Sequence, residues 1–237
     1  MTADLFIRIG NSSVEYAFNS KRIFRSVVGQ WSKITRFIQS QKVKRVVFSS
    51  VNPPLSRQLK SKCRSLGVAV REVKSQAVPL RSPYVRSIGV DRLLNVFALS
   101  HRSRSSFVLV DLGTATTVEF FDRRKGYLGG WIAPGLPMLT HVLHDKAALL
   151  PKVDTSKIKF LSRSFGHNTQ ETLLLGIKAM IHGLLAEAEK TARHKWGSSR
   201  VQFFVTGGGL HSVGPFKGWK KVSGLQLEAL QKIADNR

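Results

Sequence analysis

FVLVDLGTATTVEF at residues 107–120 and LFIRIGNSSVEYAF at residues 5–18 share one pattern of residue types. In each segment an apolar run with strand character is followed by a glycine turn. A second apolar run, which contains a Val-Glu pair, follows the turn. The turns carry hydroxyl and amide side chains beside Gly10 and Gly113, and turns of this kind can cradle a phosphate group. The repetition predicts two related halves, each opening with a phosphate-binding hairpin. The alternative is that two β-hairpins resemble each other by chance.

Along the rest of the chain, short apolar runs alternate with longer segments of helical spacing, which is typical of an α/β protein. Further strands are expected at residues 45–49, 68–73, 126–132 and 201–205. Helices are expected at residues 27–39, 53–66, 91–100, 171–190 and 225–233, with another around Met138 and Val142. The basic, serine-rich stretch HRSRSS at 101–106 is the best candidate linker, so we expect one domain over residues 1–105 and another over 106–237.

The charge of the chain is far from neutral. Among 237 residues there are 38 Lys and Arg against 14 Asp and Glu, a formal net charge of +24 at pH 7. A field of this sign favours polyanions such as nucleic acid or phosphorylated substrates, but it does not dictate a fold. Nucleic-acid binding would rest on nonspecific charge alone, because no helix-turn-helix, RNA-recognition or zinc-finger signature appears.

Several classes of protein are excluded or disfavoured by absent patterns. The single Cys63 rules out an internal disulfide framework and a cysteine-rich zinc site. The sequence contains no apolar run of about 18 residues, so no transmembrane helix is expected. The N-terminus does not have the pattern of a secretory signal. By elimination we expect a cytoplasmic protein without a membrane partner. Neither G-x-x-x-x-G-K-[ST] nor a G-x-G-x-x-G after a strand is present, so an ATP site would need another architecture.

A third glycine segment, Thr206-Gly207-Gly208-Gly209, follows the strand expected at 201–205. Two hairpin tips that grip phosphates, with a glycine segment that accommodates adenosine, are found in the actin-like ATPase fold. The expected fold class is therefore α/β, with two related actin-like/ribonuclease-H-like domains of the acetate and sugar kinase, heat-shock protein and actin superfamily. In that fold the active site lies in the cleft between the domains.

Seven motifs in a fixed order span nearly the whole chain. They are Ile9-Gly10-Asn11-Ser12, Ser49-Ser50-Val51, Gly89-Val90-Asp91-Arg92, Asp111-Leu112-Gly113-Thr114-Ala115-Thr116-Thr117, Gly129-Gly130-Trp131-Ile132-Ala133-Pro134-Gly135-Leu136, Asn168-Thr169 and Thr206-Gly207-Gly208. In this series the sequence resembles the type III pantothenate kinases, also called the Bvg accessory factor family. The resemblance implies ATP-dependent phosphorylation of pantothenate to 4'-phosphopantothenate, the first step of coenzyme A biosynthesis. It also implies a homodimer.

The resemblance assigns the phosphoryl acceptor site to the G-x-D-R motif. Asp91 matches the family's proton acceptor, and Gly89, Val90 and Arg92 match its pantothenate contacts. The chemistry agrees, because a hydroxyl that attacks a γ-phosphate needs a carboxylate within hydrogen-bond reach. An arginine can in turn form two parallel hydrogen bonds with the carboxylate of pantothenate. The alternative is an Asp-Arg pair that only caps a helix.

The other site assignments also follow from the resemblance. Asp111 matches a ligand of K⁺ (or NH₄⁺), and Mg²⁺ is expected to accompany ATP. Thr169 matches a substrate contact, with the N-cap of the long helix as its alternative. Tyr84 is a candidate pantothenate contact, although it lies nearer to Gly89 than the family's tyrosine does. The expected ATP-binding residues are Arg8, Ile9, Gly10, Asn11, Ser12, Ser13, Thr114, Gly207 and Gly208.

The first phosphate motif departs from the family pattern D-x-G-N-T followed by a lysine. Arg8 stands where the aspartate is expected, and Glu15 stands where the lysine is expected. Both changes reverse a charge close to the expected phosphates and metal. Because Arg8 and Glu15 fall on neighbouring strands of one hairpin, we expect them to form a compensated ion pair. The alternative function is a catalytically impaired family member that acts as a regulatory or binding protein.

Overall fold

The structure is a computed structural model that describes residues 4–18, 22–82, 87–161, 164–214 and 216–235. Two compact units make up the chain: Met1–Arg102 with Gly224–Arg237, and Ser103–Ser223. The chain passes from the first unit to the second within the basic stretch at residues 101–106. The C-terminal segment belongs to the first unit, whereas the sequence places it in the second domain. This difference arises because helix α7 (Leu225–Asp235) packs on α3 (Val90–Arg102) and β1 (Asp4–Ile9).

The first unit is built on a mixed five-stranded sheet in the order β3-β2-β1-β4-β5. Its other strands are β2 (Ser13–Ala17), β3 (Phe24–Val27), β4 (Arg45–Ser50) and β5 (Ala69–Glu72). Helices α1 (Trp31–Ser40) and α2 (Pro53–Ser65) bury their apolar sides against alternate residues of β1, such as Leu5, Ile7 and Ile9. Arg8 points to the opposite face of the sheet by strand alternation. A short 3₁₀ helix, η1 (Ser75–Ala77), precedes α3.

The second unit repeats this topology. Its sheet has the order β10-β9-β6-β7-β8, formed by β6 (Ser106–Leu112), β7 (Ala115–Asp122), β8 (Gly126–Pro134), β9 (Val201–Thr206) and β10 (Lys220–Lys221). In both units the first strand pairs antiparallel with the second and parallel with the fourth. This shared order and direction confirm the predicted α/β fold class with two related halves, and argue against a chance resemblance of hairpins.

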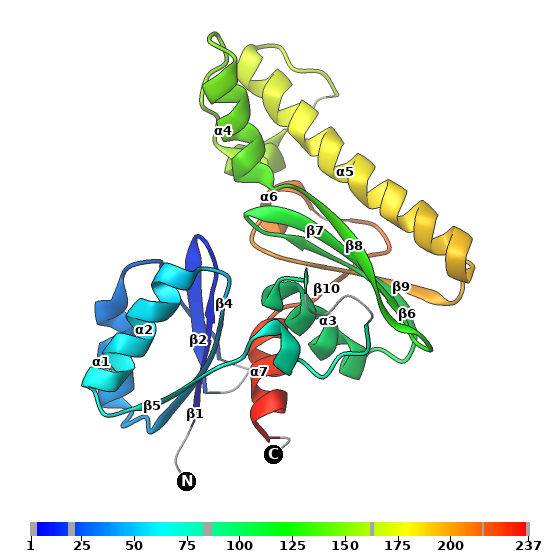
Figure 1. Cartoon of the computed structure of the whole chain (residues 1–237). Helices are drawn as coiled ribbons and strands as arrows, with labels where there is room; N and C mark the ends of the chain where they lie inside the picture. Colours follow the sequence, from blue (N-terminus) through cyan, green and yellow to red (C-terminus); the bar gives the residue numbers. More distant parts are fainter. Residues whose placement is uncertain (1–3, 19–21, 83–86, 162–163, 215, 236–237) are drawn as a thin grey trace. The chain divides into compact units, whose positions relative to one another are not determined.

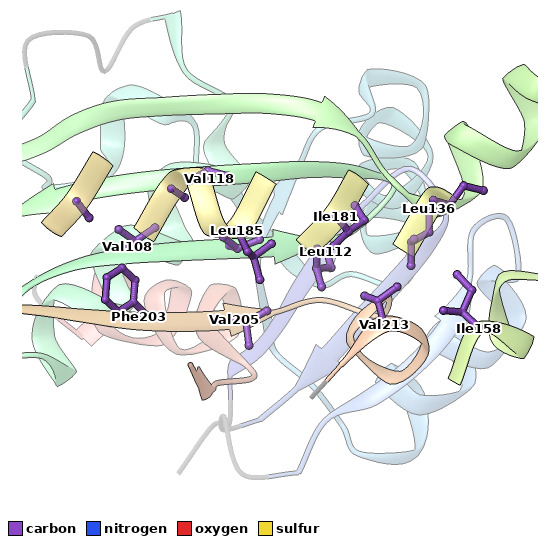
Figure 2. Packing of buried hydrophobic residues seen from close by; sticks show 14 of the residues in the cluster. Val108, Leu112, Val118, Leu136, Ile158, Ile181, Leu185, Phe203, Val205 and Val213 are labelled. Atoms are coloured by element: carbon purple, nitrogen blue, oxygen red, sulfur yellow. The ribbon is translucent and has the colours of Figure 1, made fainter. Parts of the chain in front are cut away.

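One face of the second sheet is covered by the long helix α5 (Thr169–Trp196), shown in yellow in Figure 1. Figure 2 shows Ile181 and Leu185 of α5 packed among Val108 and Leu112 of β6 and Val118 of β7. The other helices of this unit are α4 (Leu136–Lys146), η3 (Thr155–Phe160) and α6 (Leu210–Val213). Core packing thus fixes the carboxyl end of β6, where the second glycine turn begins.

Six buried positions form the side of α5 that packs on the sheet: Leu174, Ile177, Ile181, Leu185, Ala188 and Ala192. Met180 has 58% of its surface exposed. The spacing of the buried positions keeps one side of the helix on the sheet, and Met180 falls just outside it.

Two strands were not expected from the sequence. β3 and the turn after it occupy the start of the stretch predicted as a helix over residues 27–39, so α1 begins at Trp31. The break is set by Gly29, whose φ of 83° is accessible to glycine and strained for other residues. β10 has only two residues, Lys220 and Lys221, too few for a recognisable pattern. Among the described residues, no helix has the length and apolar character needed to cross a membrane.

Cys63 provides a direct test of the packing of the first unit. It is fully buried on α2, and burial raises the pKa of its thiol to about 11. Because the thiolate is the reactive form, we expect almost no reaction with a thiol reagent at pH 8 in native buffer. Unfolding in guanidinium chloride should release one reactive thiol per chain. Rapid stoichiometric labelling of the native protein would contradict this packing.

Candidate active site

The first glycine turn joins β1 to β2 at residues 10–13. The Gly10 N–H donates to the Ser13 carbonyl oxygen at 2.9 Å, which closes the turn. Asn11 and Ser12 lie exposed at the tip, whereas Ile9 and Gly10 are buried. The Ile9 carbonyl oxygen accepts a hydrogen bond from the Val51 N–H at 3.2 Å, which ties the end of β1 to the residue after β4. The predicted turn therefore exists, with its polar tip accessible to a ligand.

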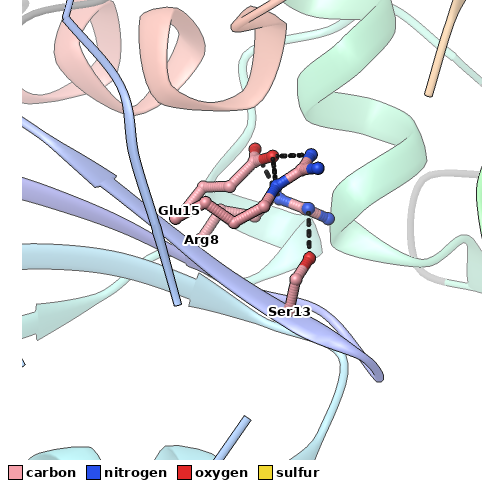
Figure 3. Close-up of polar contacts among 4 residues, drawn as sticks. Arg8, Ser13 and Glu15 are labelled. Atoms are coloured by element: carbon pink, nitrogen blue, oxygen red, sulfur yellow. Dashed lines mark hydrogen bonds and ion pairs between the residues drawn. The ribbon is translucent and has the colours of Figure 1, made fainter. Parts of the chain in front are cut away.

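Arg8 and Glu15 form the ion pair that the sequence predicts. The two residues are register partners on β1 and β2, and Arg8 Nε donates to Glu15 Oε2 at 3.2 Å. Arg8 Nη2 also donates to Ser13 Oγ at 3.2 Å, so the guanidinium reaches along the hairpin to the turn (Figure 3). A second cation, Arg25 on β3, donates from Nε to Glu15 Oε1 at 3.0 Å. Arg25 was not a candidate from the sequence alone, because β3 was not predicted.

Glu15 is held in its charged form by these two arginines. Burial by itself raises the pKa of the Glu15 carboxyl. The charge of Arg8, then hydrogen bonding and charge from Arg25 and a hydrogen bond from Arg8, outweigh burial and leave the pKa below its ordinary value. The cluster of one carboxylate and two guanidinium groups therefore carries a net positive charge next to the first turn.

The second glycine turn begins at Asp111, at the end of β6. Glycines of two other segments pack closely against this turn. A Cβ atom on Gly135 would lie 2.2 Å from the Thr114 carbonyl oxygen, and one on Gly207 would lie 2.5 Å from Asp111 Oδ1. Gly207 also has a φ of 97°, and the Gly209 N–H donates to the Leu112 carbonyl oxygen at 2.9 Å. The glycine segment after β9 is thus seated on the end of β6, beside the Asp111 carboxylate.

Gly208 and Thr114 are the exposed residues of these two segments. No heavy atom lies within 4 Å of a Cβ built on Gly208, and Thr114 is exposed at the tip of the turn. The second unit therefore brings Asp111 and Gly207 together and leaves Gly208 and Thr114 at the surface.

The G-x-D-R motif lies at the start of α3. Asp91 falls in the first turn of the helix, which begins at Val90. A Cβ on Gly89 would lie only 2.7 Å from Asp91 Oδ1, so a larger residue at this position would collide with the carboxylate. Asp91 and Arg92 are both half-buried, and Val90 is buried. The Ser75 hydroxyl donates to the Ile88 carbonyl oxygen at 2.7 Å and anchors the segment that leads into the motif.

Comparison with known proteins now assigns the family. The sequence profile described as type III pantothenate kinase matches residues 5–191. The chain belongs to the type III pantothenate kinase family. A type III pantothenate kinase of Persephonella marina is 33% identical over 225 residues, which cover 86% of this chain and 86% of the relative.

Solved structures agree on the fold. A Campylobacter jejuni protein, provisionally described as a Baf family transcriptional activator, superposes with a TM-score of 0.67 at 19% identity, covering 98% of this chain and 97% of its own. A Sinorhizobium meliloti protein, provisionally described as a 2-dehydro-3-deoxygalactonokinase, gives a TM-score of 0.54 at 11% identity and 97% coverage of both chains. At such identities these likenesses show the fold alone.

Tyr84 and Thr169 are the two remaining residues that match the pantothenate contacts of the family. Tyr84 lies outside the described residues. Thr169 is exposed at the first position of α5, but it is not the N-cap. That role belongs to Asn168, whose side-chain oxygen accepts a hydrogen bond from the Glu171 N–H at 2.9 Å. The capping alternative for Thr169 is therefore wrong.

The two glycine turns of the chain differ in whether their side chains can bind a cation. Asp111 presents a hard carboxylate oxygen over Gly207, and Mg²⁺ or K⁺ in kinase sites commonly binds one such oxygen together with substrate phosphates. This donor fits a cation. Beside the first turn, the carboxylate of Glu15 is already engaged by two arginines, so that turn does not fit a divalent metal. In the described part of the chain, no three or more His, Cys, Asp or Glu residues gather as a metal site.

Proposed function

We propose that this chain is an active pantothenate kinase, which transfers the γ-phosphate of ATP to the primary hydroxyl of pantothenate. The observation that carries the proposal is family membership together with an intact G-x-D-R motif at the start of α3, where only glycine at position 89 leaves room for the Asp91 carboxylate. The alternative, an impaired regulatory member, is not favoured, because the relatives that the chain matches are described as type III pantothenate kinases and because Arg8 and Glu15 pair with each other.

Asp91 acts as the proton acceptor in this mechanism. Its carboxylate accepts a hydrogen bond from the pantothenate hydroxyl and orients the oxygen for in-line attack on the γ-phosphorus. As the new O–P bond forms and the bond to the β-phosphate oxygen breaks, the hydroxyl proton passes to Asp91 and ADP leaves. Such a reaction depends mainly on positioning and on charge stabilisation.

The residues that match the family's pantothenate contacts are proposed to hold this substrate. Arg92 binds the pantothenate carboxylate with two hydrogen bonds, which fixes the far end of the substrate. The backbone at Gly89 and Val90 contacts the substrate body, and Tyr84 and Thr169 supply further contacts. These roles are proposals taken from the motif match.

The two glycine turns bind the nucleotide. In the first unit the contacts are Arg8, Ile9, Gly10, Asn11, Ser12 and Ser13. In the second unit they are Thr114, Gly207 and Gly208, with Asp111 as the ligand of a K⁺ or NH₄⁺ ion. The cation, like the Mg²⁺ that enters with ATP, supplies positive charge that offsets the negative charge of the phosphates.

The test is an ADP-release assay on the purified chain with ATP, Mg²⁺ and K⁺, with and without pantothenate. We expect ADP release that depends on pantothenate, with 4'-phosphopantothenate identified by mass spectrometry. Replacement of K⁺ by Na⁺ should lower the rate if Asp111 holds a monovalent cation. ADP release at the same rate with and without pantothenate would contradict the assignment of pantothenate kinase activity.

A homodimer is proposed on the basis of exposed apolar side chains on the second unit. Met138 and Val142 lie one turn apart on α4, with 43% and 55% of their surfaces exposed, and Leu149 just beyond this helix is 93% exposed. Single exposed apolar residues are ordinary, but a group of them on one face is typical of an interface. A second copy of the chain is the proposed occupant. Light scattering should give a dimer for the native chain and a monomer for Val142→Glu.

We also propose a cytoplasmic location, because ATP and pantothenate meet there. Nucleic acid is expected to bind only through the net charge. Any retention on DNA should disappear by about 200 mM salt without sequence preference.

A further inference from the structure

The same position of the repeated fold carries opposite charges in the two units. Arg8 precedes Gly10 by two residues, and Asp111 precedes Gly113 by two. Both lie near the end of the parallel strand pair of their sheet, Arg8 opposite Ser49 and Asp111 opposite Thr206. The duplication therefore places a guanidinium in the first unit where the second unit has a carboxylate.

The Arg8 guanidinium is built into the hairpin. Its side chain is only 21% exposed, and its Nε and Nη2 groups donate to Glu15 and Ser13. Nη1 lies at the turn, since a Cβ on Gly10 would come within 3.0 Å of it. An arginine has five N–H donors, and within the described residues only these two hydrogen bonds engage them. The remaining donors include those of Nη1 beside Gly10, and Figure 3 shows the Arg8 side chain bonded to Ser13 of the same turn.

Arg25 completes this arrangement from the neighbouring strand. It is 61% exposed and shares the carboxylate of Glu15 with Arg8. The shared carboxylate holds the Arg8 side chain in place, and the second guanidinium leaves the cluster with a net positive charge. Positive charge, several N–H donors and hydroxyl groups suit a phosphate and repel a divalent cation.

We propose that the first turn binds the terminal phosphates of the donor directly through Arg8, without a metal ion, so that ATP binds this protein without Mg²⁺. Glu15 and Arg25 are positioning residues for Arg8. The inference rests on the proposed function, since it takes ATP as the donor. The inference goes beyond the proposed function because it assigns to Arg8 the phosphate contact that a metal ion would otherwise make.

The experiment measures the dissociation constant of ATP by calorimetry in excess Mg²⁺ and in excess EDTA. For the native chain we expect the two constants to agree within about threefold. Arg8→Gln should weaken metal-free ATP binding at least tenfold, whereas adenosine, which lacks phosphates, should bind both proteins equally. Arg36→Gln is the matched control, because it removes the same charge from α1 on the other face of the sheet and should change neither constant.

A second variant covers the case in which Arg8→Gln disturbs the hairpin. In Arg8→Asp/Glu15→Lys the ion pair is kept with its charges exchanged, and ATP binding should become dependent on Mg²⁺. Equal affinity for ATP without Mg²⁺ in the native chain and both variants would overturn the inference. The proposed kinase function would still stand in that case if the native chain phosphorylates pantothenate. Failure of the native chain to bind ATP in either buffer would overturn both.

Discussion

Asp91→Asn is expected to lower pantothenate-dependent ADP release by about a thousandfold, within the range attributed to a positioned general base. Asparagine keeps the size of the side chain and one oxygen, so it can still orient the hydroxyl, but it cannot accept the proton at neutral pH. Because Asp91 lies in the first turn of α3, loss of its charge also removes a favourable interaction with the helix dipole. That should reduce the free energy of unfolding by only about 0.5 kcal/mol.

Two measurements separate this catalytic loss from a general defect. The dissociation constant of ATP should be nearly unchanged, because the proposed nucleotide contacts are in the glycine turns. Glu187→Gln, on an exposed part of α5, removes the same charge and should leave turnover unchanged. If Asp91→Asn keeps more than a tenth of the native rate, Asp91 is not the proton acceptor, and its role is reduced to shaping the start of the helix.

The features that could be predicted from the sequence are those that depend on residues close together in the chain. Strand–turn repetition at Gly10 and Gly113 led to two related halves, and the identical strand orders of the two sheets confirm them. Cross-strand neighbours on a tight hairpin are fixed by the turn between them. The Arg8–Glu15 pair was therefore predictable without a structure.

Features that depend on contacts between distant segments could not be predicted. Arg25 reaches Glu15 only because β3 pairs with β2, and four residues of mixed polarity do not indicate a strand. The return of α7 to the first unit depends on packing against α3, which the ion pair between Arg102 and Glu228 reinforces. Nothing in the local sequence of α7 specifies which sheet it covers.

Gly207→Ala is expected to damage the second phosphate turn severely. The native φ of 97° is strained for alanine, and the new methyl group would lie 2.5 Å from Asp111 Oδ1 and 2.6 Å from Leu112 backbone atoms. Neither neighbour can yield easily, since Leu112 is buried at the end of the central strand β6. We expect the free energy of unfolding to fall by about 3 kcal/mol. We also expect ATP to bind at least tenfold more weakly, because the displaced carboxylate can no longer hold the cation proposed for Asp111.

Two other glycines serve as controls, because the same substitution meets different surroundings there. A methyl group on Gly208 meets no heavy atom within 4 Å, so Gly208→Ala should leave the free energy of unfolding within about 0.5 kcal/mol of native. Gly183, exposed within α5, has equally open space, and Gly183→Ala should stabilise the protein by about 0.5–1 kcal/mol because alanine favours the helix. Urea unfolding of the three variants gives the comparison. Equal stability of Gly207→Ala and Gly208→Ala would mean that the glycine segment does not rest on β6, and that Asp111 is positioned by other contacts.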